Sequence, residues 1–205
     1  MFEKCHKSRS TRAIKGSGNL PIIAVSGPHG SGKSTAAHKV AEVLGYEYIA
    51  AGKLFREMAS KEGLNLEEYS KKAEENEEID RYIDDRTLEI DKNSDNVVID
   101  AQLGGWILKD IADLIIYVTA PFETRVERIA KRDNKTIEEV RVETITREES
   151  EKKRYKALYN IDVSDLSIYD IIINSLKFNA SDCVQIIIEA YNKYIKGDKK
   201  WQQFK

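Results

Sequence analysis

A run of glycines followed by a lysine and two hydroxyl side chains lies near the amino-terminus and suits the binding of phosphate groups. The run consists of Gly27, Pro28, His29, Gly30, Ser31, Gly32, Lys33, Ser34 and Thr35. Residues 27–34 fit the pattern Gly-x-x-x-x-Gly-Lys-Ser/Thr, in which the glycines let backbone N–H groups wrap around an anion. Lys33 is expected to reach the β- and γ-phosphates of a nucleotide, and Ser34 to hold Mg²⁺. The run therefore predicts nucleotide binding.

Two side chains of this run have less defined roles. His29 stands where the pattern allows any residue, so we expect it to contribute its backbone to the loop rather than to carry protons. Thr35 is expected either to contact the α-phosphate or to cap the following helix. The phosphate chemistry of the run is thus assigned mainly to Lys33 and Ser34.

Several arginines could neutralise charge during the transfer of a phosphoryl group. The candidates are Arg56, Arg128, Arg132, Arg147 and Arg154. Transfer between two polyanions needs cations around the moving group, and the planar arginine side chain binds phosphate oxygens in pairs. Arg147 and Arg154 are separated by two helical turns and share a helix face. We therefore predict Lys33, Arg147 and Arg154 as catalytic, and Arg56, which follows the second predicted strand, as a ligand of the acceptor phosphate.

A carboxylate is expected close to the phosphate loop. Asp100 ends the apolar run 96–100, which reads as a strand. The carboxyl ends of parallel strands meet at the edge where ligands bind, so Asp100 would lie beside the loop. We expect it to hold Mg²⁺, directly or through water, or to bind the acceptor; the alternative is a cap at the end of the strand.

The elements that carry these residues alternate between short β-branched runs and longer helical patterns. This order is typical of an α/β fold, here a five-stranded parallel sheet flanked by helices. The predicted strands are 22–26, 47–50, 96–100, 114–119 and 169–174. The predicted helices are 33–44, 52–62, 65–75, 77–91, 121–132, 136–158 and 180–195.

The domain organisation follows from charge. A single domain is expected over 20–195, with a basic disordered leader at 1–19 and a tail at 196–205. Charged residues cover almost every face of the helices within 51–94 and within 132–160. These two segments are expected to be loosely anchored moving parts, one an acceptor-binding insertion and the other a lid.

Composition excludes several classes of protein. The 205 residues carry 33 Lys and Arg against 35 Asp and Glu, a net charge of −2, so nucleic acid is not expected as a partner of the folded domain. No apolar run reaches the roughly 20 residues of a membrane span. Two cysteines form neither a disulfide framework nor a zinc site. We expect a cytoplasmic monomer.

Other classes of phosphate-loop protein lack support. The guanine-reading pattern Asn-Lys-x-Asp is incomplete, because residues 134–137 read Asn-Lys-Thr-Ile, and no Leu-Ser-Gly-Gly sequence occurs. The chain is also short for a remodelling ATPase. A small kinase, with ATP on the sheet and an arginine-bearing lid, is the design that remains.

The sequence resembles the archaeal-type cytidylate kinases, a branch of the nucleoside monophosphate kinases, over about residues 21–195. The matching segments are 26–35, 52–59 (Gly-Lys-Leu-Phe-Arg-Glu-Met-Ala), 103–106 (Leu-Gly-Gly-Trp), 147–155 (Arg-Glu-Glu-Ser-Glu-Lys-Lys-Arg-Tyr) and 159–170. The resemblance implies transfer of the γ-phosphate of ATP, with Mg²⁺, to CMP or dCMP, giving CDP or dCDP and ADP. It also implies that Arg56 binds the acceptor phosphate, that Arg147 and Arg154 are lid cations, and that Asp162 lies nearby.

Two residues depart from the family pattern on the acceptor side. Lys53 replaces an acid, and Gln102 replaces an arginine expected to contact the acceptor. The exchange of a charged for a neutral hydrogen bond at Gln102 would cost on the order of 1 kcal/mol. We hypothesise that the pair retains phosphate binding with an altered acceptor preference.

Two alternatives stand beside the cytidylate kinase hypothesis. The first is a related small kinase with another nucleotide or nucleoside as acceptor, which the two departures favour. The second is a sensor that binds nucleotide without turnover. The lid arginines argue against a sensor, because a protein that only binds need not neutralise charge that develops in the transition state.

Overall fold

The computed structural model describes residues 21–91 and 96–195, and its fold is the predicted α/β fold. Five parallel strands form one sheet in the order β2-β3-β1-β4-β5. The strands are β1 (Ile22–Ser26), β2 (Glu47–Ala50), β3 (Val97–Asp100), β4 (Leu114–Thr119) and β5 (Ile171–Asn174). The helices are α1 (Lys33–Leu44), α2 (Ala51–Lys61), α3 (Leu66–Glu75), α4 (Glu78–Asp91), α5 (Gly104–Ile107), α6 (Phe122–Asp133), α7 (Ile137–Tyr159) and α8 (Ala180–Ile195).

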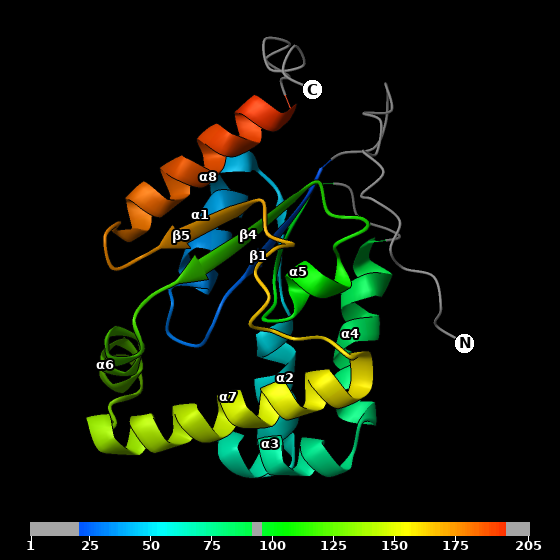
Figure 1. Cartoon of the computed structure of the whole chain (residues 1–205), viewed down its shortest axis with the longest axis vertical. Coiled ribbons are helices and arrows are strands. Elements are labelled where there is room, and N and C mark those ends of the chain that lie inside the picture. The colour runs from blue at the N-terminus through cyan, green and yellow to red at the C-terminus, as the bar shows by residue number, and fades with distance from the viewer. Residues whose placement is uncertain (1–20, 92–95, 196–205) are drawn as a thin grey trace.

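The strands are almost wholly apolar because helices cover both faces of the sheet. On one face, α1 and α8 pack side by side against residues such as Ile23, Val98 and Ile116 (Figure 1). On the other face, α5 and the residues after it cover Ala24 and Ile99. Since β1 lies at the centre, the loop that follows it opens at the carboxyl edge of the sheet, beside the end of β3.

Most predicted boundaries are confirmed to within one or two residues. The third strand begins at Val97 rather than at 96, because Asn96 takes a positive φ of 65° that does not continue a strand. The last strand begins at Ile171, two residues later than predicted. The short helix α5 was not predicted. The leader 1–19 and the tail 196–205 lie outside the described residues.

Helices α2, α3 and α4 form an arm with an apolar cluster of its own. Ala59, Tyr69, Ala73, Ile79 and Ile83 are buried against one another, away from the sheet. The arm therefore stands off the main core as its charge pattern predicted. Its apolar residues supply the contacts that join the three helices.

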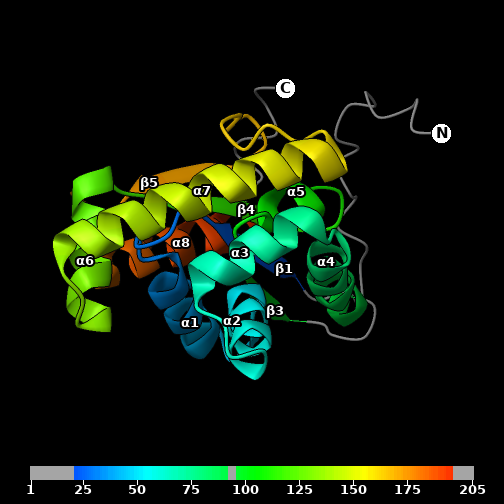
Figure 2. The ribbon, with the colours of Figure 1, turned by 90° about the horizontal axis from the view of Figure 1, so that it is seen from below.

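Helix α7 lies across the carboxyl edge of the sheet, and α3 runs beside it (Figure 2). A capping box at Thr136 fixes its amino-terminal end. Ser150 donates a hydrogen bond to the carbonyl oxygen of Ser70 on α3, and the Tyr159 hydroxyl donates to Asp84 on α4. In this structure, polar residues of the predicted lid segment therefore bind polar groups of the arm.

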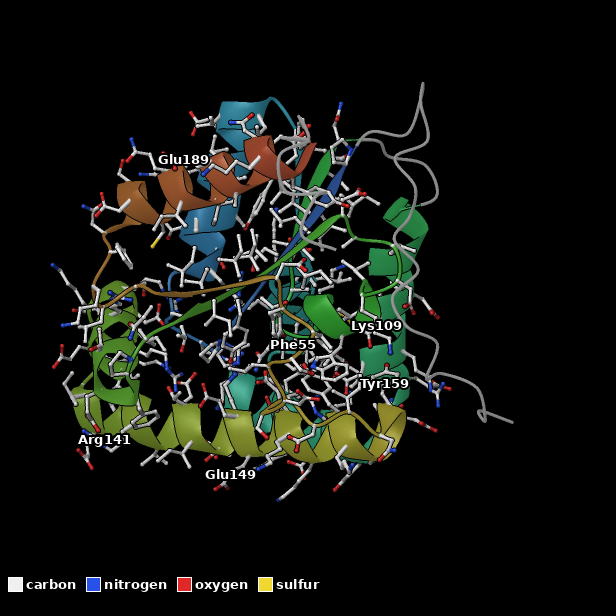
Figure 3. The ribbon with its side chains drawn as sticks, turned by 45° about the horizontal axis from the view of Figure 1, so that its top comes forward. Phe55, Lys109, Arg141, Glu149, Tyr159 and Glu189 are labelled. Carbon is white, nitrogen blue, oxygen red and sulfur yellow. The ribbon has the colours of Figure 1, made fainter. Side chains whose placement is uncertain are left out.

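The outer face of α7 carries residues that take no part in these contacts. Arg141 and Glu149 point away from the sheet, whereas Tyr159 lies at the end of α7 near α4 (Figure 3).

Among the described residues, the structure contains no helix long and apolar enough to cross a membrane.

Candidate active site

The loop between β1 and α1 adopts a conformation suited to an anion, as predicted. Gly27, Gly30 and Gly32 have φ angles of 147°, 75° and 90°, which side chains rarely tolerate. A Cβ atom on Gly27 would lie 2.0 Å from the carbonyl oxygen of Val118, and one on Gly30 would lie 2.6 Å from that of Arg125. Gly32, the N-cap residue of α1, supplies no side-chain cap, and the N–H of Lys33 makes only a long hydrogen bond of 3.4 Å to Ser31 Oγ. The start of α1 therefore still offers N–H groups to an anion.

Side chains from α6 and from the end of β5 hold this loop in place. The Ser175 hydroxyl donates to the carbonyl oxygen of Ser31 at 2.7 Å. Arg128 donates to the hydroxyl and carbonyl oxygens of Ser175 at 2.8 and 2.9 Å. Arg125 donates to the carbonyl oxygen of His29 at 2.9 Å. Arg128, a candidate phosphate ligand in the sequence, thus also braces the loop, and the roles of Arg125 and Ser175 were not predicted.

Two cavities meet at the phosphate loop. The first has a volume of about 440 Å³ and extends from the loop between α6 and the start of α8. The second has a volume of about 90 Å³ and opens between the arm, the end of β3 and α7. His29, Lys33, Ser34, Arg56 and Arg147 line both cavities. Three of the predicted cations, Lys33, Arg56 and Arg147, therefore lie where the two spaces join. Arg154 lines only the smaller cavity, and Arg128 and Arg132 line only the larger one.

Positive charge is concentrated at this junction. Burial lowers the pKa of Lys33 below its usual value. The positive charges of Arg147 and Arg56 lower this pKa further, whereas Asp100 and Glu151 raise it. Nε of Arg147 is buried and finds no hydrogen-bond partner among the described residues. The junction is therefore suited to bind an anion that supplies the missing acceptors.

Two carboxyl groups of α4 line the smaller cavity. Burial raises the pKa of Asp80 to about 6, although the attraction of Arg154, 3.3 Å away, works against this change. Burial also raises the pKa of Asp84 to about 7, against the hydrogen bond that Asp84 accepts from Tyr159. Arg154, a predicted lid cation on α7, is 4% exposed and lines the same cavity.

Asp100, which lines this cavity, has one carboxylate oxygen that makes no hydrogen bond among the described residues. The Tyr48 hydroxyl donates to its Oδ2 atom at 2.9 Å, and its Oδ1 atom is buried with no hydrogen-bond partner among the described residues. Asp100 and the hydroxyl-bearing Ser34 line the same cavity. Oxygen ligands of this kind fit Mg²⁺, which takes only one or two carboxylates when phosphates provide the rest.

The remaining predicted residues are dispersed. Gln102 lines the smaller cavity. Lys53 is exposed and pairs with Glu57 at 3.7 Å, and Asp162 accepts hydrogen bonds from Ser164 in an exposed turn. The structure therefore brings Gln102 to Arg56 and Asp100, but it does not place Lys53 or Asp162 among the residues that line either cavity.

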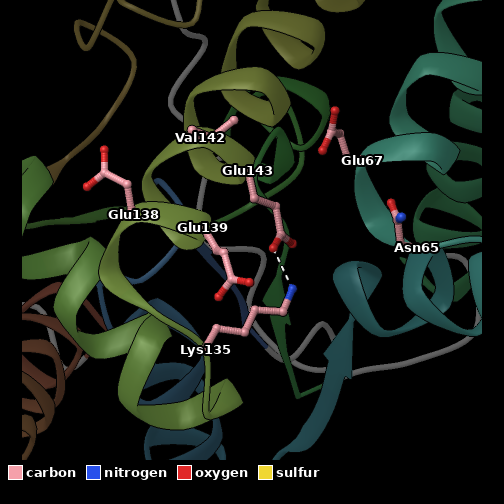
Figure 4. A pocket seen from close by; sticks show the side chains of 7 residues that line it. All are labelled: Asn65, Glu67, Lys135, Glu138, Glu139, Val142 and Glu143. Atoms are coloured by element: carbon pink, nitrogen blue, oxygen red, sulfur yellow. Dashed lines mark hydrogen bonds and ion pairs between the residues drawn. The ribbon is translucent and has the colours of Figure 1, made fainter.

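A further cavity of about 530 Å³ lies between α3 and the start of α7, apart from the phosphate loop. Four glutamates surround it, and one of them, Glu143, pairs with Lys135 (Figure 4). The lining residues are Asn65, Glu67, Lys135, Glu138, Glu139, Val142 and Glu143. Because its net charge is negative, this space is unsuited to nucleotide phosphates.

The raised pKa of Asp84 predicts a pH-dependent effect of the variant Asp84→Asn on stability. The folded protein binds this proton more tightly than the unfolded chain, so stability is lost as the pH rises from about 4 through about 7. The variant removes the titration, and we expect it to raise the free energy of unfolding by on the order of 1 kcal/mol at pH 8, with little gain at pH 5. Urea unfolding at both pH values measures the effect.

The matched control is Asp85→Asn, which changes the exposed neighbour of Asp84. It should leave stability nearly the same at both pH values. An equal effect of Asp84→Asn at pH 5 and pH 8 would contradict the assignment of a titrating, buried carboxyl group.

Comparison with known proteins places this chain in a family. The sequence model of the cytidylate kinase-like family matches residues 22–177. A cytidylate kinase from Archaeoglobus fulgidus is 49% identical over 87% of this chain and 99% of its own length. A cytidylate kinase from Sulfurisphaera tokodaii is 48% identical over 85% of this chain and 96% of its own length. The resemblance seen in the sequence is confirmed.

Solved structures support the fold alone. An uncharacterized protein from Eubacterium ventriosum superposes with a TM-score of 0.63 at 18% identity, over 83% of this chain and 98% of that one. A shikimate kinase from Acinetobacter baumannii, in complex with shikimate, superposes with a TM-score of 0.54 at 20% identity, over 84% and 93% of the two chains. From its sequence match and its extensive identity with these relatives, the chain belongs to the cytidylate kinase-like family.

Proposed function

We propose that the protein is a cytidylate kinase, which transfers the γ-phosphate of ATP to CMP or dCMP and releases ADP and CDP or dCDP. The observation that carries this proposal is the meeting of two cavities at Lys33, Arg56 and Arg147. A phosphoryl donor and a phosphorylated acceptor need such an arrangement, with cations between them. The curated relatives carry the same activity in their names.

The larger cavity is assigned to ATP. It includes the phosphate loop and the first turn of α1, whose N–H groups would bind the β- and γ-phosphates together with Lys33. Gly27, Pro28, His29, Gly30, Ser31, Gly32, Lys33, Ser34 and Thr35 form this part of the proposal. Ser34 and Asp100 would hold Mg²⁺, which when bound neutralises charge on the phosphates.

The smaller cavity is assigned to the acceptor nucleotide. An oxygen of the acceptor phosphate forms a bond to the γ-phosphorus, and the bond from that phosphorus to the β–γ bridging oxygen breaks. The electron pair of the broken bond stays on ADP. The attacking oxygen is already anionic, so the chemistry needs no general base; the task of Lys33, Arg147 and Arg154 is to offset the charge of the moving group.

Acceptor preference is assigned to residues around Arg56. Arg56 would bind the acceptor phosphate, and Gln102 would donate a neutral hydrogen bond where the family pattern has arginine. Lys53 lies one turn before Arg56 on α2 and would restore part of the lost positive charge at longer range. Asp162 remains a proposed acceptor residue on the resemblance alone.

The proposed function also assigns a role to each of the two charged helical segments. The arm within 51–94 would bind the nucleoside monophosphate, and the segment 132–160 would act as the lid. We further propose that the protein acts as a monomer in the cytoplasm, where ATP and CMP occur.

The test is an acceptor profile with the purified protein, ATP and Mg²⁺. CMP, dCMP, UMP, AMP and GMP are supplied separately, and the diphosphates formed are measured, with Lys33→Met as the inactive control. We expect turnover of CMP and dCMP at least about tenfold above the others. Turnover of another acceptor would redirect the assignment, and ATP binding without any turnover would favour a sensor.

The same profile tests the acceptor-side departures. The double variant Lys53→Asp/Gln102→Arg returns both positions to the family pattern. A shift in the ratio of rates among the acceptors is expected, because both changes alter the charge near Arg56. An unchanged ratio would remove Lys53 and Gln102 from the proposal without affecting the assignment of the reaction.

A further inference from the structure

His29 of the phosphate loop is bound directly to the lid helix. Its Nε2 atom lies 2.9 and 3.0 Å from the two carboxylate oxygens of Glu151 on α7. The side chains of His29 and Glu151 are 17% and 8% exposed, so water competes little for this contact. A hydrogen bond to a charged group under such conditions is among the stronger contacts in a protein.

The backbone of His29 is held by the neighbouring helix. Its carbonyl oxygen accepts a hydrogen bond from Arg125 on α6, and Arg125 also pairs with Glu148 on α7. The side chain of His29 is therefore bound to α7 directly, and its carbonyl oxygen is bound to α7 through Arg125. Among the described residues 27–35, His29 alone forms a side-chain hydrogen bond or ion pair with α7.

Glu151 is placed so that its position fixes that of the two lid arginines. Arg147 precedes it by one helical turn and Arg154 follows it by about one turn, so all three share a face of α7. All three line the smaller cavity together with Lys33. Burial raises the pKa of Glu151, but its pairing with His29, followed by the charges of Arg147 and Arg154, lowers this pKa overall below its usual value. Glu151 is therefore a carboxylate at neutral pH.

The protonation state of His29 is compatible with a donor role. Burial lowers its pKa, and the positive charges of Arg147 and Lys33 lower it further against the opposing effect of Glu151. A neutral imidazole with its proton on Nε2 donates to the Glu151 carboxylate.

We infer that His29 is a positioning residue that docks α7 onto the phosphate loop through Glu151, and so holds Arg147 and Arg154 over Lys33. This inference rests on the proposed function. It connects the loop assigned to ATP with the helix that lines the cavity assigned to the acceptor. The loop that would bind the ATP phosphates then carries, on its own side chain, the attachment point of the helix that supplies the lid cations. The position that the sequence pattern leaves open thereby acquires a role through its side chain.

The test compares His29→Gln with His29→Asn. The amide nitrogen of glutamine takes the place of Nε2 and can still donate to Glu151, whereas that of asparagine lies nearer the backbone, at the place of Nδ1. We expect His29→Asn to lower kcat about tenfold, with a smaller change in the KM of ATP, and His29→Gln to retain most of kcat. Equal losses in the two variants, or a loss confined to the KM of ATP, would overturn the inference.

A double-mutant cycle shows whether Glu151 is the partner. In the background Glu151→Ala, the change His29→Asn should lower kcat less than twofold further, because the bond is already absent. Full multiplication of the two losses would contradict the link. Glu149→Gln, on the outer face of the same helix, is the control and should leave kcat unchanged.

Hydrogen exchange separates this inference from the proposed reaction. Exchange of the backbone amides of α7 over 147–154 needs no turnover and reports how often this part of the helix opens, which its attachment to the loop should suppress. His29→Asn should speed this exchange, and His29→Gln should do so less. If the wild type fails to phosphorylate CMP but these exchange rates differ as expected, the proposed reaction is wrong and the docking of α7 through His29 is supported. If the exchange rates are unchanged in both variants, the docking is wrong and the proposed reaction is unaffected.

Discussion

Replacing Lys33 by methionine is expected to lower kcat for CMP phosphorylation by at least about 10³-fold. Removal of a single preorganised donor costs on the order of 10²–10³ in kcat, and a buried ammonium group is stronger than a neutral donor. Lys33 lies at the junction of both cavities, and burial lowers the pKa of its ammonium group. Methionine keeps the length and packing of the side chain, so the fold should be preserved.

The measurement is a steady-state assay of CDP formation, together with the affinity for ATP at equilibrium. Lys39→Met, on an exposed position of the same helix, is the control and should keep wild-type kcat. Since the charge of the transferring group is largest in the transition state, kcat should fall far more than ATP affinity. Activity within tenfold of the wild type would show that Lys33 does not act on the reacting phosphate.

Replacing Arg147 by methionine is expected to lower kcat by on the order of 10³-fold, as for other arginines that act on a transferring phosphoryl group. Arg147 lines both cavities, and its buried Nε atom finds no hydrogen-bond partner among the described residues. A transferring phosphoryl group offers the acceptor that is missing. Arg147→Lys should restore only part of the rate, because an ammonium group cannot bind two oxygens in the planar arginine geometry.

Arg141→Met is the matched control for this variant. Arg141 lies on the outer face of α7, pairs with Glu123 on α6 and lines neither of the two cavities that meet at the loop (Figure 3). It should leave kcat within about twofold of the wild type, since ion pairs of this exposure contribute little. Similar losses for Arg141→Met and Arg147→Met would indicate damage to α7 instead of loss of a catalytic cation.

The sequence alone predicted those strands, helices and loops whose conformation is determined by residues close together along the chain. The strand Ile22–Ser26 and the helix Lys33–Leu44 were predicted to the residue, because a continuous apolar run and a clear helical stripe define them. The phosphate loop followed from residue types whose backbone conformation only glycine tolerates. Helix α5 was missed because its four residues, Gly104–Ile107, are too few to display a helical period.

Contacts between distant segments could not be predicted. His29 and Glu151 are 122 positions apart, and no pattern in either segment names the other. Arg128 reads as a free cation on a helix until the structure brings Ser175 to it. Lys53 and Arg56 are both exposed cations of α2, yet only Arg56 of the two lines the junction. Side-chain direction at such places depends on tertiary packing, which single-sequence patterns do not contain.

The strand order has a consequence for how the chain can assemble. The central strand β1 pairs on one side with β3 and on the other with β4, both of which come much later in the sequence. The apolar cluster of α2, α3 and α4, in contrast, is made by residues close together along the chain. During synthesis from the amino-terminus, the arm can therefore gather its contacts while β1 still has no neighbour. The strand that ends in the phosphate loop gains both its neighbours only after Thr119 has been made.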